Sequence, residues 1–193
     1  GIYALNARVN ARNLVIGDCG GSCAGLIYGG SYDFTHCTFY NAWPTWYSNR
    51  QLPALFLADY FANYDDDGNL VVYTGGVYDK AEFRNSIIYG NARTELVIDS
   101  YDDLQLNYLF DHCLTRIHED SSRYLNDPLF TQILNNQNPL FDSVPVSYEL
   151  DTLSPAIDAG LTTHAIGFPF DLNGNSRLDD EAPDLGAYER IEQ

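Results

Sequence analysis

The chain has 193 residues and a formal net charge of −17, with 27 acidic side chains against 10 Lys and Arg. This charge disfavours anionic partners, so we expect no nucleic acid to bind, and polyanionic sugars such as pectate are disfavoured as well. Hydrophobic residues make up 45% of the chain, which argues against disorder. No apolar run is long enough to predict a direct membrane span.

A repeat of short β-rich segments runs through the first half of the chain. Residues 27–41 return as residues 72–91, with the same Tyr, Gly-Gly, Tyr-Asp and Phe punctuation. Each copy contains three runs in a fixed order, and these occupy residues 26–30 or 70–76, then 34–41 or 83–91, then 54–57 or 95–98. The runs are rich in Ile, Val, Leu, Tyr and Phe and are separated by Gly, Asn and Asp, which is typical of short strands joined by turns.

This repeat predicts an all-β fold, a right-handed parallel β-helix that forms a three-faced solenoid of about three to four coils. A β-sandwich or a propeller also has short strands, but neither explains the fixed order of the three runs. We place the coils in residues 1–124 and an irregular C-terminal capping region in residues 125–193. The chain has no methionine and begins with Gly1, so we expect further N-terminal coils to lie outside it. An uncapped first coil would favour self-association through its strand edge.

Alternation within the second run assigns side chains to the two faces of the predicted wall. Small side chains recur at one position, and a His/Asn column lies beside it: Cys37, Ser86 and Cys113, preceded by His36, Asn85 and His112. Because neighbouring side chains in a strand point in opposite directions, the small ones are predicted to face inward and the His/Asn column outward or into a turn. Cys19 and Cys23 either form a small-loop disulfide or stay reduced, and the sequence leaves this open.

Two insertions interrupt the first full turn of the repeat, at residues 42–51 and 58–69. They supply flat aromatic side chains for sugar rings and carboxylates that accept hydrogen bonds from sugar hydroxyls. The predicted ligand-binding residues are Trp43, Trp46, Tyr47, Tyr60, Tyr64, Asp65, Asp66 and Asp67. The alternative is that these aromatic side chains only seal the insertions against the wall.

Catalytic residues are harder to assign. Asp99, Asp102 and Asp103 cluster after the third run and are the alternative catalytic set, as in a fragment of a polysaccharide lyase or glycoside hydrolase. However, Lys80 is the only lysine, the arginines near it are scattered along the sequence, and neither a Gly-His-Gly element nor a Gly-x-Ser-x-Gly elbow is present. The sequence therefore favours a protein that is not an enzyme.

Three ordered motifs mark the C-terminal part of the chain: Ser-Pro-Ala-Ile-Asp-Ala-Gly at 154–160, Asp-Leu-Asn-Gly-Asn-Ser-Arg at 171–177, and Asp-Leu-Gly-Ala-Tyr-Glu at 184–189. With them the chain resembles bacterial parallel β-helix repeat proteins of the pectate-lyase-like class that end in a "choice-of-anchor Q" region. The five residues 178–182 lengthen the usual link between the last two motifs. The resemblance implies an exported, surface-associated bacterial protein and implies no particular activity.

Residues 171–179 also copy the alternate spacing of oxygen ligands in a calcium loop, with Asp171, Asn173, Asn175 and Asp179 as candidate ligands. Ala182 stands where the loop would need its bidentate glutamate. The alternative is an Asx-rich turn without Ca²⁺. No other cofactor is expected.

The sequence thus predicts a non-catalytic secreted or cell-surface protein that binds carbohydrate or adheres through its aromatic insertions. The polysaccharide lyase or hydrolase fragment is one alternative, and a purely structural surface spacer is the other.

Overall fold

The computed structural model describes residues 1–42, 50–101, 106–120, 126–142, 147–179 and 181–191. Nearly all regular structure in this part of the chain is β. In chain order the elements are β1 (Ile2–Arg12), β2 (Val15–Gly17), β3 (Ala24–Thr35), β4 (Thr38–Asn41), β5 (Leu55–Ala58), β6 (Phe61–Tyr64), β7 (Leu70–Tyr73), β8 (Tyr78–Gly90), β9 (Leu96–Asp99), β10 (Tyr108–Thr115), β11 (Phe130–Thr131), β12 (Leu134–Asn135) and α1 (Thr162–Ala165).

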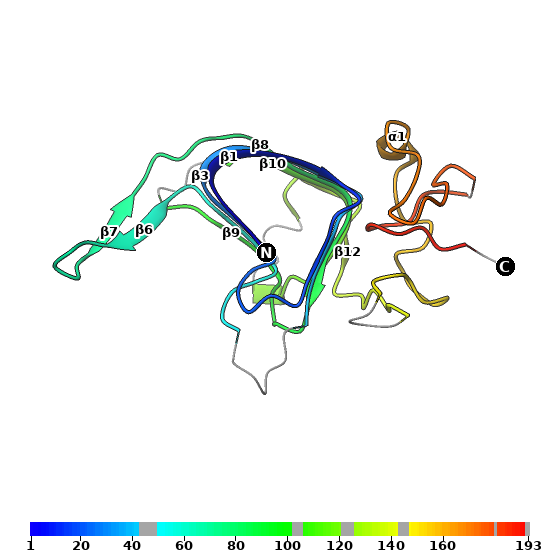
Figure 1. The fold of residues 1–193 in the computed structure, drawn as a ribbon, viewed down its shortest axis with the longest axis horizontal. Helices are drawn as coiled ribbons and strands as arrows, with labels where there is room; N and C mark the ends of the chain where they lie inside the picture. The colour runs from blue at the N-terminus through cyan, green and yellow to red at the C-terminus, as the bar shows by residue number, and fades with distance from the viewer. Residues whose placement is uncertain (43–49, 102–105, 121–125, 143–146, 180, 192–193) are drawn as a thin grey trace.

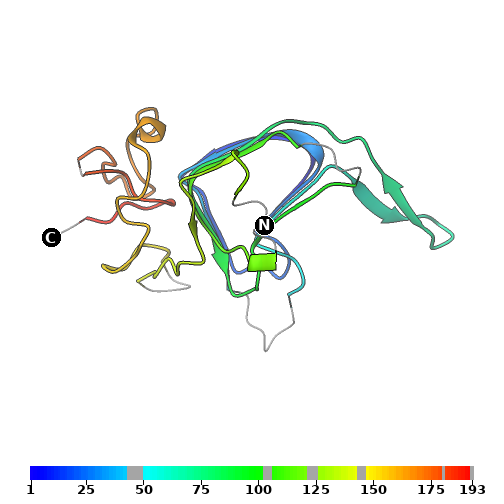
Figure 2. The same ribbon diagram turned by 180° about the vertical axis from the view of Figure 1, so that it is seen from behind.

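Ten of these strands join in one parallel sheet, whose main path runs β11-β10-β8-β3-β5-β9. β1 pairs with β3, β2 with β4, β4 with β8, and β12 with β10. β6 and β7 form a separate antiparallel hairpin. Figure 1 shows the curved stack of long strands, with the hairpin on one side and the segment that follows β12 on the other. We call this part of the chain, from residue 136 onward, the C-terminal segment. Figure 2 shows the same arrangement from behind.

The predicted three-faced solenoid is wrong: the chain forms one 10-stranded parallel sheet with an added antiparallel hairpin. The prediction ended the first run at residue 30 and began the second at residue 34, on another face of the solenoid. Instead, β3 continues through both glycines, which adopt φ values of +79° and +122° inside the strand where its pairing register shifts. Residues 70–76 do not begin a new face either, since β7 within them pairs back on β6.

The core of the sheet is a stack of phenylalanine rings. Phe34, Phe83, Phe110 and Phe130 stack in that order, with ring centroids 5.2, 4.7 and 4.7 Å apart. Pairing register sets this stack, because Phe34 is the Cα partner of Phe83, Phe83 of Phe110, and Phe110 of Phe130. Burying such large apolar side chains is the main term that stabilises the stack.

The predicted inward column is confirmed, since Cys37, Ser86 and Cys113 are all fully buried. Beside it, His36, Asn85 and His112 have left-handed backbone, with φ of 53°, 45° and 52°. They were predicted to face outward or into a turn, but His36 and Asn85 are fully buried, and the side chain of Asn85 bonds the backbone of Leu161. The bend at this column lets strands of one sheet change direction without losing their register.

The C-terminal segment packs on the outer side of this bend. Leu150, Ala156 and Leu185 form a second buried cluster with Ile87 and Leu114 of the sheet. β11 and β12 both pair with β10, so the parallel sheet extends to residue 135. The domain boundary after residue 124 stays a prediction. Within the described residues, no helix is long and apolar enough to cross a membrane.

Candidate functional site

The beginning of the hairpin β6–β7 borders a row of residues that are aligned across β1, β3 and β5. Pairing register aligns the row: Tyr3 of β1 pairs with Gly25 of β3, which pairs with Phe56 of β5. Gly25 has no side chain, and a Cβ at this position would lie 3.4 Å from the ring of Tyr3. Glycine at this position therefore opens a depression between two aromatic side chains.

This depression is the first of two neighbouring hollows. It has a volume of about 470 Å³ and a largely apolar lining that includes Tyr3, Ile27, Phe56, Tyr60 and Phe61. A concave, mostly apolar surface with a few polar groups is the usual form of a small-ligand site.

The second hollow has a volume of about 280 Å³ and is lined by Leu5, Tyr28, Phe61, Asn63 and Tyr73. Phe61 lines both hollows, and its ring stacks on that of Tyr73 with centroids 5.9 Å apart. We call the two hollows together the aromatic groove. Tyr3 is 70% and Tyr73 53% exposed, so their ring faces are available to a ligand.

Tyr60 gives the aromatic groove a polar group. Its hydroxyl donates a 2.6 Å hydrogen bond to Oδ2 of Asp99, and this bond, with burial, raises the pKa of Tyr60 to about 12. The phenol therefore stays neutral, and Tyr101 packs beside it with ring centroids 5.9 Å apart. Asp99, one of the alternative catalytic residues, thus acts as an acceptor for Tyr60, whereas Asp102 and Asp103 lie outside the described residues.

The predicted ligand-binding residues do not all come together. Tyr60 lines the aromatic groove, while Tyr64 and Asp65–Asp67 lie at the exposed tip of the hairpin. Asp65 accepts hydrogen bonds from the backbone N–H groups of Asp67 and Asn69, at 3.0 and 2.8 Å, and those from Asn69 hold the pKa of its carboxyl below the ordinary value. This carboxylate closes the β6–β7 turn. Trp43, Trp46 and Tyr47 lie outside the described residues.

The sequence did not point to Tyr3, Phe56, Phe61 or Tyr73. Tyr3 and Phe56 are 53 positions apart and meet only through the pairing of β1, β3 and β5. The alternation of outward residues in β5 was the one signal that could have identified Phe56.

A third hollow, of about 530 Å³ and polar, lies farther along the sheet and is lined by Arg8, Arg12, Asp33, Lys80 and Phe168, among others. Arg12 and Lys80 both bind the carboxylate of Asp33, at 2.8 and 2.6 Å. Burial opposes ionisation of Asp33, but the hydrogen bond from Lys80 and the charge of Arg12 outweigh it and keep its pKa below the ordinary value. Arg12, Lys80 and Arg84 are thus gathered on one face, where Asp33 and Glu82 compensate much of their charge.

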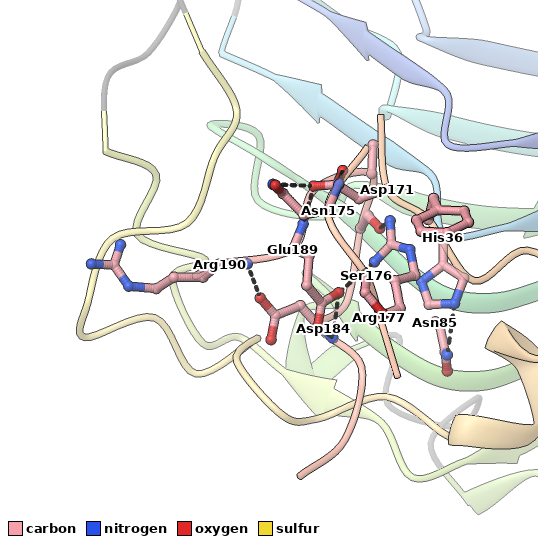
Figure 3. Close-up of polar contacts among 12 residues, drawn as sticks. His36, Asn85, Asp171, Asn175, Ser176, Arg177, Asp184, Glu189 and Arg190 are labelled. Carbon is pink, nitrogen blue, oxygen red and sulfur yellow. Dashed lines mark hydrogen bonds and ion pairs between the residues drawn. The ribbon is translucent and has the colours of Figure 1, made fainter. Parts of the chain in front are cut away.

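The proposed calcium ligands form a closed turn. Both carboxylate oxygens of the buried Asp171 accept hydrogen bonds, from the backbone N–H groups of Asn173, Asn175 and Glu189 at 2.7–2.8 Å. The side-chain amide of Asn175 also donates to Asp171, at 3.1 Å (Figure 3). Asp179 is exposed. This geometry favours the Asx-turn alternative, and Ca²⁺ stays an untested prediction.

A cluster of titratable side chains that the sequence did not suggest lies where the C-terminal segment contacts β10. Asp111 and His112 of β10 meet His164 of α1. Burial opposes ionisation of Asp111, but hydrogen bonds from His164 and His112 outweigh it and lower its pKa. Nothing in the local sequence around residue 164 indicates this contact, because it depends on how the segment folds back.

All four cysteines are free in the structure. Burial raises the pKa of Cys37 and Cys113 to about 12, so both thiols stay protonated. Burial also raises the pKa of Cys23, with a further contribution from Cys19.

Comparison of the chain with protein-family models, with curated proteins and with solved structures finds no match. The resemblance carried by the three C-terminal motifs therefore stays a prediction.

Proposed function

We propose that the protein is a non-catalytic carbohydrate-binding protein and that the aromatic groove binds a neutral glycan. The observation that carries this proposal is that the exposed Tyr3 and Tyr73 and the half-buried Phe61 line two adjoining, largely apolar hollows. Tyr3, Phe61 and Tyr73 present flat apolar surfaces of the kind that pack on the C–H faces of sugar rings.

The groove also offers polar groups that orient sugar hydroxyls. Asn63 lines the second hollow, and the Tyr60 hydroxyl with the Asp99 carboxylate lies beside the first. A few fixed polar groups on an apolar surface give orientation to a ligand that the rings hold. The net charge of −17 favours a neutral glycan over an acidic one.

Export to the bacterial surface belongs to the same proposal. It is supported by the resemblance of the three C-terminal motifs and not by the groove itself. Self-association through the outer edge of β1 is a separate expectation.

A panel of neutral and uronic oligosaccharides tests the glycan proposal by calorimetric titration. We expect a neutral oligosaccharide to bind, and Phe61→Ala to weaken its binding by about tenfold or more, because a ring that serves both hollows is lost. Tyr64→Ala is the matched control, since Tyr64 is an exposed aromatic residue of the same hairpin outside the groove.

Equal losses in both variants, or no binding by any member of the panel, would contradict the proposal. Turnover of a polysaccharide that Asp99→Asn abolishes would support the lyase or hydrolase alternative instead. Trp43→Ala and Trp46→Ala test whether the insertion at residues 42–51 contributes to the same surface.

A further inference from the structure

Asp111, His112 and His164 bring one carboxylate and two imidazole rings close together. Nδ1 of His112 lies 2.8 Å from Oδ1 of Asp111, and Nε2 of His164 lies 2.7 Å from Oδ2 of the same carboxylate. One carboxylate oxygen and the two imidazole nitrogens all lie within 4.8 Å of one another. This is close enough for a single ion to contact all three after small side-chain rotations.

The donor set selects the kind of ion. Imidazole nitrogen with carboxylate oxygen suits Zn²⁺ and neighbouring transition metals, whereas Ca²⁺ and Mg²⁺ prefer oxygen ligands alone. Three protein ligands would leave further coordination positions for water. At present the two imidazoles share one carboxylate through hydrogen bonds, and an ion would replace the protons of those bonds.

Hydrogen bonds between the side chain of Asn85 in β8 and the backbone of Leu161 hold α1 in place beside the sheet. The side chain of Asn85 accepts from the N–H of Leu161 at 2.9 Å and donates to the carbonyl of Leu161 at 3.0 Å. Leu161 immediately precedes α1, so this pair of bonds fixes the start of the short helix that carries His164. Such supporting contacts orient the ligands of metal sites.

The cluster is also accessible to an ion. The side chains of Asp111, His112 and His164 are 16%, 19% and 17% exposed, so they are partly shielded but reachable. The nearest cation in register is Arg84, the Cα partner of Asp111. Its guanidinium binds Glu82 at 2.8 Å and contacts Asp33 at 3.5 Å, so its charge is compensated by these two carboxylates.

We propose that Asp111, His112 and His164 form a binding site for a divalent transition metal ion, with Zn²⁺ as the best fit. The ion would join β10 to α1 across 53 residues of sequence and so fasten the C-terminal segment to the sheet. Figure 1 shows α1, which carries His164, and the hairpin at opposite ends of the molecule, so the proposed ion site does not depend on glycan binding.

Calorimetric titration of the metal-stripped chain with Zn²⁺ tests the site, together with Co²⁺ absorption spectra. We expect one Zn²⁺ per chain, a Co²⁺ spectrum without a thiolate charge-transfer band, and a higher melting temperature with Zn²⁺. His164→Gln should weaken binding by about tenfold or more. His112→Asn should do the same and keep the fold, since Asn85 already occupies the matched left-handed position.

His118→Gln is the matched control, because His118 is a partly exposed histidine that lies 3.3 Å from Asp120 outside this cluster. A Cys19→Ser/Cys23→Ser double variant controls for binding by the two neighbouring thiols. Both controls should bind Zn²⁺ like the unmodified chain. The proposal is overturned by no Zn²⁺ binding, by unchanged binding in His164→Gln and His112→Asn, or by loss of binding in the cysteine variant.

Discussion

Nη1 of Arg177 donates a 2.8 Å hydrogen bond to Oε2 of Glu189, and these two side chains are only 0% and 2% exposed. They belong to the second and third C-terminal motifs, which this ion pair joins. Nη2 of Arg177 also reaches the carbonyl of Gly186 and Oδ1 of Asn13, both at 3.1 Å. Arg177 therefore ties the two motifs, whose side chains Figure 3 shows, to each other and to the loop that follows β1.

Arg177→Ala should destabilise the protein by about 3–5 kcal/mol, because Glu189, Gly186 and Asn13 lose the hydrogen-bond donor that the buried guanidinium supplies, whether or not Glu189 is ionised. Urea denaturation measures the change in the free energy of unfolding. The matched control is Arg93→Ala, which removes an exposed ion pair with Asp120 and should cost about 1 kcal/mol or less. Similar losses in the two variants would contradict the structural role of Arg177.

The same network should make stability depend on pH. Burial is the main cause that raises the pKa of Glu189 to about 8 and that of Asp184 to about 6. Both carboxyls bind protons more tightly in the folded than in the unfolded state, so their contribution is fully present only below about pH 4 and is lost as the pH rises to 8.

We therefore expect the melting temperature to fall between pH 5 and pH 8. Glu189→Gln should flatten this dependence, since glutamine cannot ionise and still offers an oxygen to Arg177. Melting curves followed by circular dichroism measure both slopes. An unchanged slope in the variant would show that Glu189 does not titrate in this range.

Asn85 adopts a left-handed backbone conformation, and its side chain bonds Leu161; substitutions can separate these two roles. Asn85→Gly keeps the left-handed backbone (φ 45°) but removes both bonds to Leu161, so hydrogen exchange at the Leu161 amide should accelerate. Asn85→Ala loses the same bonds and adds backbone strain, so it should be less stable than Asn85→Gly by about 1 kcal/mol. Slow exchange at Leu161 in both variants would mean that other contacts hold α1.

Thiol reactivity tests the cysteine assignments. Cys19 is half-buried, while Cys23, Cys37 and Cys113 are buried, so a thiol reagent should label Cys19 first in the native protein. Labelling under denaturing, non-reducing conditions should then find four thiols. A count of two would instead show the Cys19–Cys23 disulfide that the sequence left open.

Sequence patterns predicted the features that depend on alternation within a strand. The inward position of Cys37 and Cys113 follows from side-chain spacing, and the structure confirms it. The solenoid prediction was wrong because it separated residues 26–30 and 34–41 into two runs, whereas β3 continues from Ala24 to Thr35 with a register shift at Gly30, and only the pairing partners of a strand reveal this.

Most residues of the candidate site could not be predicted from the sequence. Tyr60 was predicted because it lies in an insertion, but Tyr3 reaches the groove only through cross-strand register, and His164 reaches Asp111 only when the C-terminal segment folds back. Contacts between residues so far apart depend on the tertiary fold, which local patterns do not encode.

The most direct test of glycan binding by the aromatic groove is a crystal structure of the chain with the neutral oligosaccharide that binds it best. We predict that sugar rings stack on Phe61 and Tyr73 in the groove and that a sugar hydroxyl contacts Tyr60 or Asp99. A sugar bound elsewhere, with the groove filled only by solvent, would contradict the proposed function.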